Sequence, residues 1–148
     1  MQIIIKDYNN FEINNDGIVV SNQLQKILEN IKESPAKNSS GFKKAFRKAL
    51  DVNGYPSEIK INPNQRITIT TMKNNVGICL PLGNIARAFY DLMKLNYYSM
   101  IHSGFSAILI CPINPNDNKA YFSRITEEIE DMYSKFIRFP IRIIGIDQ

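Results

Sequence analysis

This chain of 148 residues has no tryptophan, one histidine and two cysteines. Cys79 and Cys111 both lie in apolar runs, so we expect buried, reduced thiols, with a disulfide as the less favoured alternative. His102 has no cysteine near it in the sequence, which argues against a zinc site or a Cys–His nucleophile. No apolar run is long enough to span a bilayer, and the N-terminal run is too short for a signal peptide. The sequence therefore predicts a cytoplasmic protein without a membrane segment.

The remaining composition is that of one globular domain, which we place at residues 1–148. Hydrophobic residues make up 44% of the chain and charged residues 22%, which excludes a wholly disordered protein. The formal net charge of +4 is compatible with an anionic partner such as nucleic acid. A charge of this size does not by itself require such a partner.

The first third of the chain predicts strand pieces followed by two helices. Residues 1–18 have the pattern of short strands broken by a turn at Asp16-Gly17. Ser21 is a suitable N-cap for the first helix, which carries apolar residues at helical spacing. Residues 40–54 predict a second helix with an apolar stripe on one side and lysine and arginine on the other.

The rest of the chain alternates between strands and helices. Three extended segments at residues 58–61, 66–72 and 76–80 predict a three-stranded meander. A long helix from residue 84 to 104 follows, with an apolar band that predicts burial over more than half of its circumference. The expected remainder is a buried central strand (105–113), an acidic helix and a final strand (140–146). These elements predict an α/β fold with a mixed central sheet flanked by helices.

Particular residues narrow this α/β class. The stretch KNNVGICLPLGNIARAFYDLMKL, followed by GFSAILICPI and later by FPIRIIGI, resembles the BamHI and BglII group of type II restriction endonucleases. SGFKKAFRKAL and the Gly54-Tyr55 pair extend the resemblance upstream, and Gly83-Asn84 with the helix after it is its most specific part. The resemblance implies a restriction-endonuclease-like fold of the PD-(D/E)XK type, and double-stranded DNA as the partner.

The same resemblance indicates that the usual catalytic carboxylates are missing. It places the family's Asp at Thr70, its Glu at Cys79 and the next acidic or amide residue at Pro81. Such carboxylates hold Mg²⁺, whereas a hydroxyl, a soft thiol and a proline ring are poor ligands for it or none. No Asp or Glu lies between Glu58 and Asp91, so a small shift of the alignment restores nothing. We therefore expect no catalytic residues, no metal and no cofactor.

The other titratable residues have ordinary explanations. Glu58 is a candidate relocated carboxylate, although a solvated strand carboxylate is the simpler interpretation. Asp91 and Lys94 are spaced i, i+3 on a helix, which predicts a surface ion pair. His102 lies near the end of that helix, where a residue without a function is the simpler interpretation. The later acidic cluster predicts a solvated helix face (Glu127, Glu128, Glu130 and Asp131).

Basic and amide side chains are the more informative set. Lys and Arg bind phosphates without regard to sequence, and amides read base edges. The candidate DNA-binding residues are Lys43, Lys44, Arg47, Lys48, Lys60, Arg66, Lys73, Asn84 and Arg87. A solvated basic surface is the alternative explanation for them.

Together these observations predict a DNA-binding protein of restriction-endonuclease fold, related to restriction–modification, that has lost the usual metal-binding carboxylates. The resemblance implies a homodimer, and a catalytic partner subunit is the other option. The first alternative is an active type II endonuclease with relocated ligands, which would require Mg²⁺ and use Glu58. The second is a protein-interaction module that binds no DNA.

Overall fold

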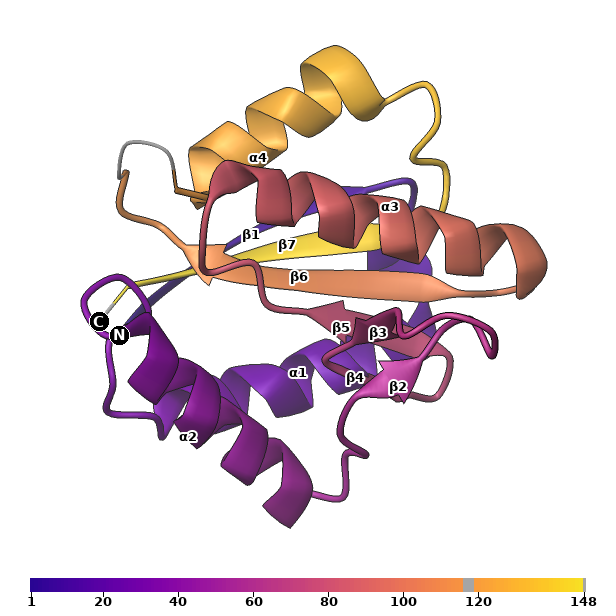
Figure 1. Cartoon of the computed structure of the whole chain (residues 1–148). Coiled ribbons are helices and arrows are strands. Elements are labelled where there is room, and N and C mark those ends of the chain that lie inside the picture. The colour runs from indigo at the N-terminus through magenta and orange to yellow at the C-terminus, as the bar shows by residue number, and fades with distance from the viewer. Residues whose placement is uncertain (116–118, 148) are drawn as a thin grey trace.

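The computed structural model describes residues 1–115 and 119–147 as an α/β fold (Figure 1). Its five-stranded sheet has the order β1-β7-β6-β5-β4, and β2 and β3 form a separate two-stranded sheet. The strands are β1 (Gln2–Tyr8), β2 (Ile59–Lys60), β3 (Thr68–Ile69), β4 (Thr71–Lys73), β5 (Val76–Cys79), β6 (Ser106–Pro112) and β7 (Ile141–Asp147). The helices are the short η1 (Phe11–Ile13), α1 (Asn15–Glu29), α2 (Ser39–Val52), α3 (Ile85–Ile101), α4 (Phe122–Glu128) and the π-helical η2 (Ile129–Tyr133).

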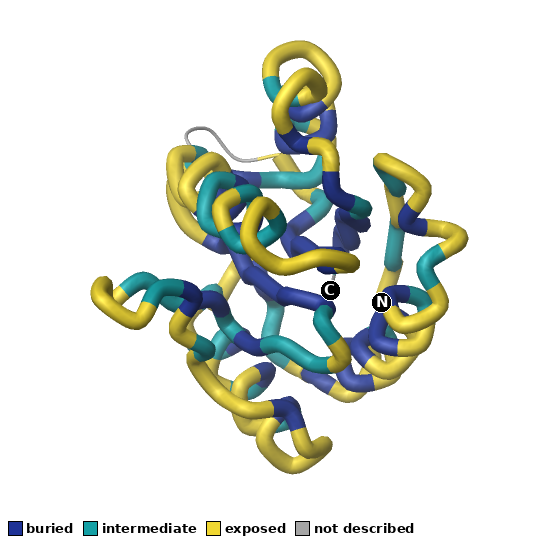
Figure 2. Tube along the Cα trace, turned by 90° about the vertical axis from the view of Figure 1, so that its right-hand side faces the viewer, coloured by how far each residue is buried: buried dark blue, intermediate teal, exposed yellow. Residues whose placement is uncertain are grey.

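The large sheet is mixed, as predicted. Strands β5, β6 and β7 run parallel to their neighbours in that group, whereas β1 pairs antiparallel with β7 and β4 pairs antiparallel with β5. The central strand β6 is buried at every position, which suits a strand covered on both faces. In Figure 2 the buried strands run through the middle of the fold, and exposed helix turns surround them. The expected fold class is confirmed.

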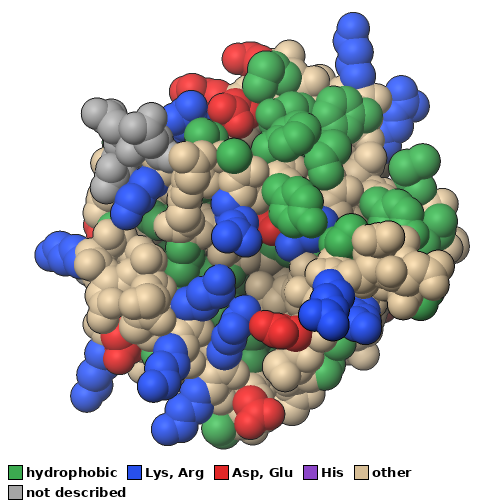
Figure 3. Space-filling model, viewed as in Figure 1, with side chains coloured by type: hydrophobic (Ala, Val, Ile, Leu, Met, Phe, Trp, Pro, Cys, Tyr) green, Lys and Arg blue, Asp and Glu red, His purple; other side chains and the backbone are tan. Residues whose placement is uncertain are grey.

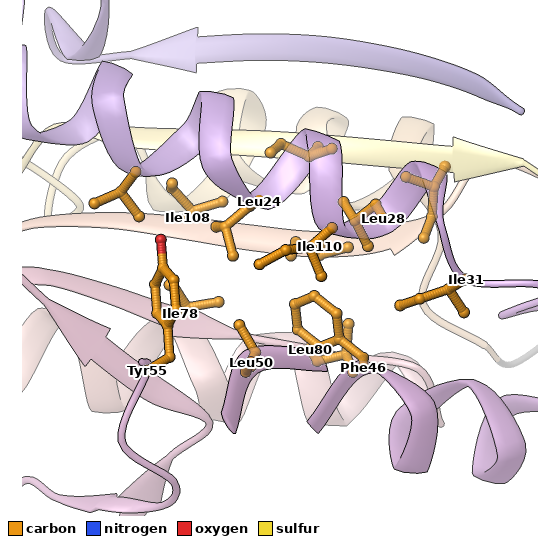
Figure 4. Packing of buried hydrophobic residues seen from close by; sticks show 14 of the residues in the cluster. Leu24, Leu28, Ile31, Phe46, Leu50, Tyr55, Ile78, Leu80, Ile108 and Ile110 are labelled. Atoms are coloured by element: carbon orange, nitrogen blue, oxygen red, sulfur yellow. The ribbon is translucent and has the colours of Figure 1, made fainter. Parts of the chain in front are cut away.

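Helices cover both faces of this sheet and form two hydrophobic cores. On one face Leu24 and Leu28 of α1 and Phe46 of α2 pack over Ile78 and Ile110 (Figure 4). On the other face α3, α4 and η2 pack over the alternate residues of the same strands. Cys79 and Cys111 are buried on that second face as free thiols, so the predicted reduced state is confirmed. No helix in the described part of the chain is long and apolar enough to cross a membrane.

The start of α1 differs from the prediction. Asp16 and Gly17 lie in its first turn, and the N-cap is Asn14, whose side chain accepts a hydrogen bond from the Gly17 N–H at 2.7 Å. Ser21 is a buried residue inside the helix, so its prediction as the N-cap was wrong. The glycine is required by packing, because a Cβ at Gly17 would lie 2.7 Å from the ring of Phe11. The expected turn at this position was therefore wrong, although β1 confirms a strand before it.

The predicted strand at residues 66–72 is interrupted at Thr70. Strand β3 pairs with β2 in the small sheet, whereas β4 pairs with β5 in the large one. Thr70 connects the two, because its N–H donates to the Ile78 carbonyl at 3.1 Å and its carbonyl accepts from the Glu58 N–H at 3.0 Å. The three-stranded meander is present along the chain, but it is divided between two sheets at this residue.

Helix α3 is less buried than its sequence predicts. Its buried residues are Ala88, Asp91, Leu92 and Leu95, which form one narrow stripe. Large apolar side chains outside the stripe are exposed, namely Phe89, Tyr90, Tyr97, Met100 and Ile101. The expectation of burial over more than half of the helix was therefore wrong for the single chain.

Candidate nucleic-acid interface

A cleft of about 340 Å³ lies between α2, the strands around Thr70 and α3. Helices α2 and α3 cover opposite faces of the large sheet, so they meet only beyond its β5–β4 edge. The cleft lies at that edge, and Figure 3 shows Lys and Arg side chains around the hollow below α3. Its charged lining residues among those described are Lys43, Arg47, Glu58, Arg87, Asp91 and Lys94. The cations therefore exceed the carboxylates by two.

Two ion pairs lie in this cleft, and they differ in exposure. Arg47 and Glu58 are 3.3 Å apart, with side chains 43% and 57% exposed. Lys94 and Asp91 are 3.0 Å apart, with side chains 12% and 6% exposed. The Lys94 ammonium also donates to the Thr68 carbonyl at 2.7 Å. The buried pair is thus fixed to the strand that leads to Thr70, whereas the outer pair faces solvent.

Electrostatic effects link the cleft residues across α2 and α3. Burial lowers the pKa of Lys43, and the cations Arg47 and Arg87 lower it further. Burial raises the pKa of Asp91, and this effect outweighs the opposing influence of Lys94, Arg87 and Lys43. A lysine whose pKa is depressed by neighbouring cations lies where positive charge is in excess. Such a place favours the binding of an anion.

The positions that the resemblance assigns to the metal-binding residues do not fit Mg²⁺. Thr70 and Cys79 both line the cleft. Pro81, two residues after Cys79, is buried. Burial raises the pKa of the Cys79 thiol well above its usual value, so it is protonated at neutral pH and is no ligand for a hard cation. Within residues 1–115 and 119–147, no three His, Cys, Asp or Glu side chains form a group that would hold a metal.

Glu58 is placed at the cleft by an unusual backbone conformation. Its φ of 45° lies in the left-handed region, which non-glycine residues rarely adopt. The residue lines the cleft and pairs with Arg47. The sequence suggested Glu58 as a relocated carboxylate, and the structure brings it to the same cleft as Thr70 and Cys79. Its partner there is a cation of the chain itself.

The structure divides the basic residues that the sequence grouped on α2. Lys43 and Arg47, spaced i, i+4, line the cleft. Lys44 and Lys48, also spaced i, i+4, line a groove on the other flank of α2, against the end of α1. The apolar stripe with Phe42 and Phe46 faces the core. The expected single patch is therefore two separate surfaces.

The other candidate DNA-binding residues lie outside the lining of the cleft, except Arg87. Lys60 and Arg66 are exposed near the small sheet. The ammonium of Lys73 lies 4.5 Å from the ring centre of Tyr55. The Asn84 side chain caps α3 by accepting from the Ala86 N–H at 2.9 Å.

Sequence reasoning missed two cleft residues, Asp91 and Lys94. Their ion pair is present, but the expectation that it lies on the surface was wrong.

His102 and the acidic cluster of the sequence lie outside the lining of the cleft. His102 is exposed and stacks on Tyr98 with ring centres 3.9 Å apart. The cluster on α4 and η2 is exposed at Glu127, Glu130 and Asp131 and partly exposed at Glu128, as a solvated acidic face should be.

Comparisons with known proteins agree with this architecture. The family model of the restriction endonucleases BglII and BglIII matches residues 12–146. A crystal structure of the restriction endonuclease BglII in complex with a DNA 16-mer is similar to the chain, with a TM-score of 0.82 and 15% identity. That match covers 100% of this chain and 79% of the other. A structure of free BglII gives a TM-score of 0.71 at 15% identity, covering 100% of this chain and 80% of the other. No curated protein matches.

Proposed function

Because this chain belongs to the BglII/BglIII family of restriction endonucleases, we propose that it binds double-stranded DNA and does not cleave it by the usual metal-dependent route. In this proposal the protein is a cytoplasmic component of a restriction–modification system, and it has kept the restriction-endonuclease fold. BglII has been crystallised with DNA, and the proposal carries that partner over to this chain.

One observation carries the proposal, namely a cleft in which cations outnumber carboxylates and the family's ligand positions are neutral. The resemblance assigns the family's carboxylates to Thr70 and Cys79, and both line this cleft. A hydroxyl and a protonated thiol supply no ligand for Mg²⁺. Lys43, Arg47 and Arg87 in the same lining supply the positive charge that attracts a phosphate backbone.

The test combines binding and cleavage of the same DNA. Supercoiled plasmid is incubated with the protein in Mg²⁺ and in Mn²⁺, and a labelled duplex is titrated by fluorescence anisotropy at low salt. We expect binding that weakens steeply with added salt, and no nicking in either metal. Nicking lost on Glu58→Ala would reject the non-cleaving assignment. No duplex binding at low salt would reject DNA as the partner and favour a protein-interaction module.

A second candidate function has one observation in its favour. Glu58 and Asp91 are both in the cleft, and Glu58 adopts a left-handed backbone conformation of the kind that clusters at functional sites. The candidate is an active endonuclease that uses these two carboxylates and Mg²⁺. Both carboxylates are already paired with cations of the chain, which is why we rank this function second.

We also propose that the protein forms a homodimer, with association with a catalytic subunit as the alternative. The exposed apolar residues of α3 support this, together with the exposed Met132 of η2 and Phe136, whose ring contacts Tyr133 at the end of η2. Phe89 of α3 contacts Tyr133 of η2, so the two elements share one surface. Figure 3 shows hydrophobic side chains gathered on this face. Sedimentation equilibrium of the wild type beside Met100→Glu separates a dimer from a monomer.

A further inference from the structure

The charged residues of the cleft are not equivalent. Glu58 is paired with Arg47, and Asp91 is paired with Lys94. In the described part of the chain, neither Lys43 nor Arg87 has a carboxylate within ion-pair distance. The excess of positive charge in the cleft therefore belongs to these two residues.

Lys43 and Arg87 also line the cleft from two different helices. Lys43 lies on α2 and Arg87 on α3, and each lines the hollow. They are close enough that the charge of Arg87 disfavours the protonated form of Lys43. Two repelling cations held by separate elements gain free energy when an anion lies between them, because the repulsion is then replaced by two attractions.

The paired residues define the shape of this position. The buried Asp91–Lys94 pair is fixed by the Thr68 carbonyl, and the Arg47–Glu58 pair lines the cleft on its solvent-facing side. Thr70 lies in the lining with a neutral hydroxyl, which is able to donate a hydrogen bond to a phosphate oxygen. A phosphate that enters here meets donors and cations, and the two carboxylates are already neutralised by their partners.

We propose that Lys43 and Arg87 clamp one DNA backbone phosphate directly, with no divalent cation between protein and phosphate. The inference rests on the proposed DNA-binding function and states how this cleft contributes to it. Where carboxylates line a phosphate site, a metal ion must offset the repulsion between like charges. Here the chain's own cations do this, so binding does not require a metal.

The first experiment measures duplex affinity by fluorescence anisotropy in EDTA, over a series of salt concentrations. We expect Lys43→Ala with Arg87→Ala to lower the affinity about tenfold and to reduce the salt slope by about 1, the value for one phosphate contact. The matched control is Lys44→Ala with Lys48→Ala on the other flank of α2, for which the slope should stay within the error of the wild type. Circular dichroism verifies that both double variants are folded.

The second experiment uses inorganic phosphate alone, followed by amide chemical shifts in EDTA. We expect shifts at Thr70 and Gly83 that are absent in the Lys43→Ala, Arg87→Ala variant. Duplex binding that the variant leaves unchanged, or that appears only when Ca²⁺ is added, would overturn the clamp and leave the DNA-binding function standing. Phosphate-induced shifts without any duplex binding would show a phosphate site at Lys43 and Arg87 but would overturn both the DNA-binding function and DNA as the ligand of the clamp.

Discussion

The two flanks of α2 carry equal formal charge and face different surroundings. Lys43 and Arg47 lie on the flank that lines the cleft, with α3 opposite. Lys44 and Lys48 lie on the flank toward α1, in a groove lined by apolar residues such as Ile27 and Val52. Burial and neighbouring cations lower the pKa of Lys43 on the first flank. The positive charge of Lys43 and Arg47 thus lies in a concave cleft, whereas that of Lys44 and Lys48 lies along an open, largely apolar groove.

This difference matters for DNA binding because the electrostatic potential is stronger where several like charges line one concave site. In the cleft, cations from two helices act on one volume, and Lys43 among them is partly buried. On the outer flank each lysine is exposed, and salt screens its charge beyond about 10 Å. Equal numbers of basic residues in the sequence therefore predict unequal contributions to DNA binding.

The largest expected effect is on the free energy of unfolding, when a lysine is replaced by methionine in the cleft and on the outer flank of α2. Lys94→Met leaves the buried Asp91 carboxylate without its cation, which should lower the free energy of unfolding by about 3–5 kcal/mol. Lys48→Met on the outer flank should change it by less than about 0.5 kcal/mol. Urea titration followed by circular dichroism measures both. Equal effects of the two variants would show that the cleft has no special electrostatic organisation.

Charge reversal should give the next largest effect, now on DNA affinity. Lys43→Glu with Arg47→Glu places like charges against the phosphate backbone and should weaken duplex binding on the order of 100-fold. Lys44→Glu with Lys48→Glu changes the net charge equally and should weaken binding by about threefold. Anisotropy titration at low salt compares the two pairs. If the outer pair had the larger effect, the interface would have to be moved to that flank.

The smallest expected effect is a dependence on alkaline pH. A phosphate partner raises the pKa of Lys43 on binding, so the contribution of Lys43 is fully present below the pKa of the free protein and is lost as the pH rises from that value through the higher pKa of the complex. Because burial and the neighbouring cations lower the pKa of Lys43 in the free protein, this loss should begin at a lower pH than for an ordinary lysine. Lys43→Arg keeps its charge in that range and should bind about threefold more tightly than the wild type there. Their affinities should agree at pH 7, and parallel pH profiles would argue against a phosphate at Lys43.

Much of the fold followed from sequence pattern, and two of its errors show the physical causes. Asp-Gly is a strong turn signal, yet at residues 16 and 17 the glycine allows close contact with the Phe11 ring inside a helix. The alternation at residues 66–72 predicts a strand, but alternation does not specify which sheet each half joins. Thr70 separates the halves because it bonds to Ile78 on one side and Glu58 on the other.

The site was predicted less completely than the fold. Spacing of i, i+4 already relates Lys43 to Arg47 and Lys44 to Lys48, so their separation was present in the sequence as a signal. Which flank faces a cleft depends on where α3 packs, and periodicity does not report that. Asp91 was missed because carboxylates are usually exposed. It is buried because α3 packs beside the cleft, where Lys94 pairs with Asp91 and donates to the Thr68 carbonyl.

The most direct test of the account is the affinity of the wild-type protein for one duplex, measured in EDTA and again in Ca²⁺ at equal ionic strength. A cleft that binds phosphate through its own cations predicts the same Kd in both buffers. A tenfold or greater gain in Ca²⁺ that Glu58→Gln abolishes would contradict it. That result would place a metal between protein and DNA and restore Glu58 as a ligand.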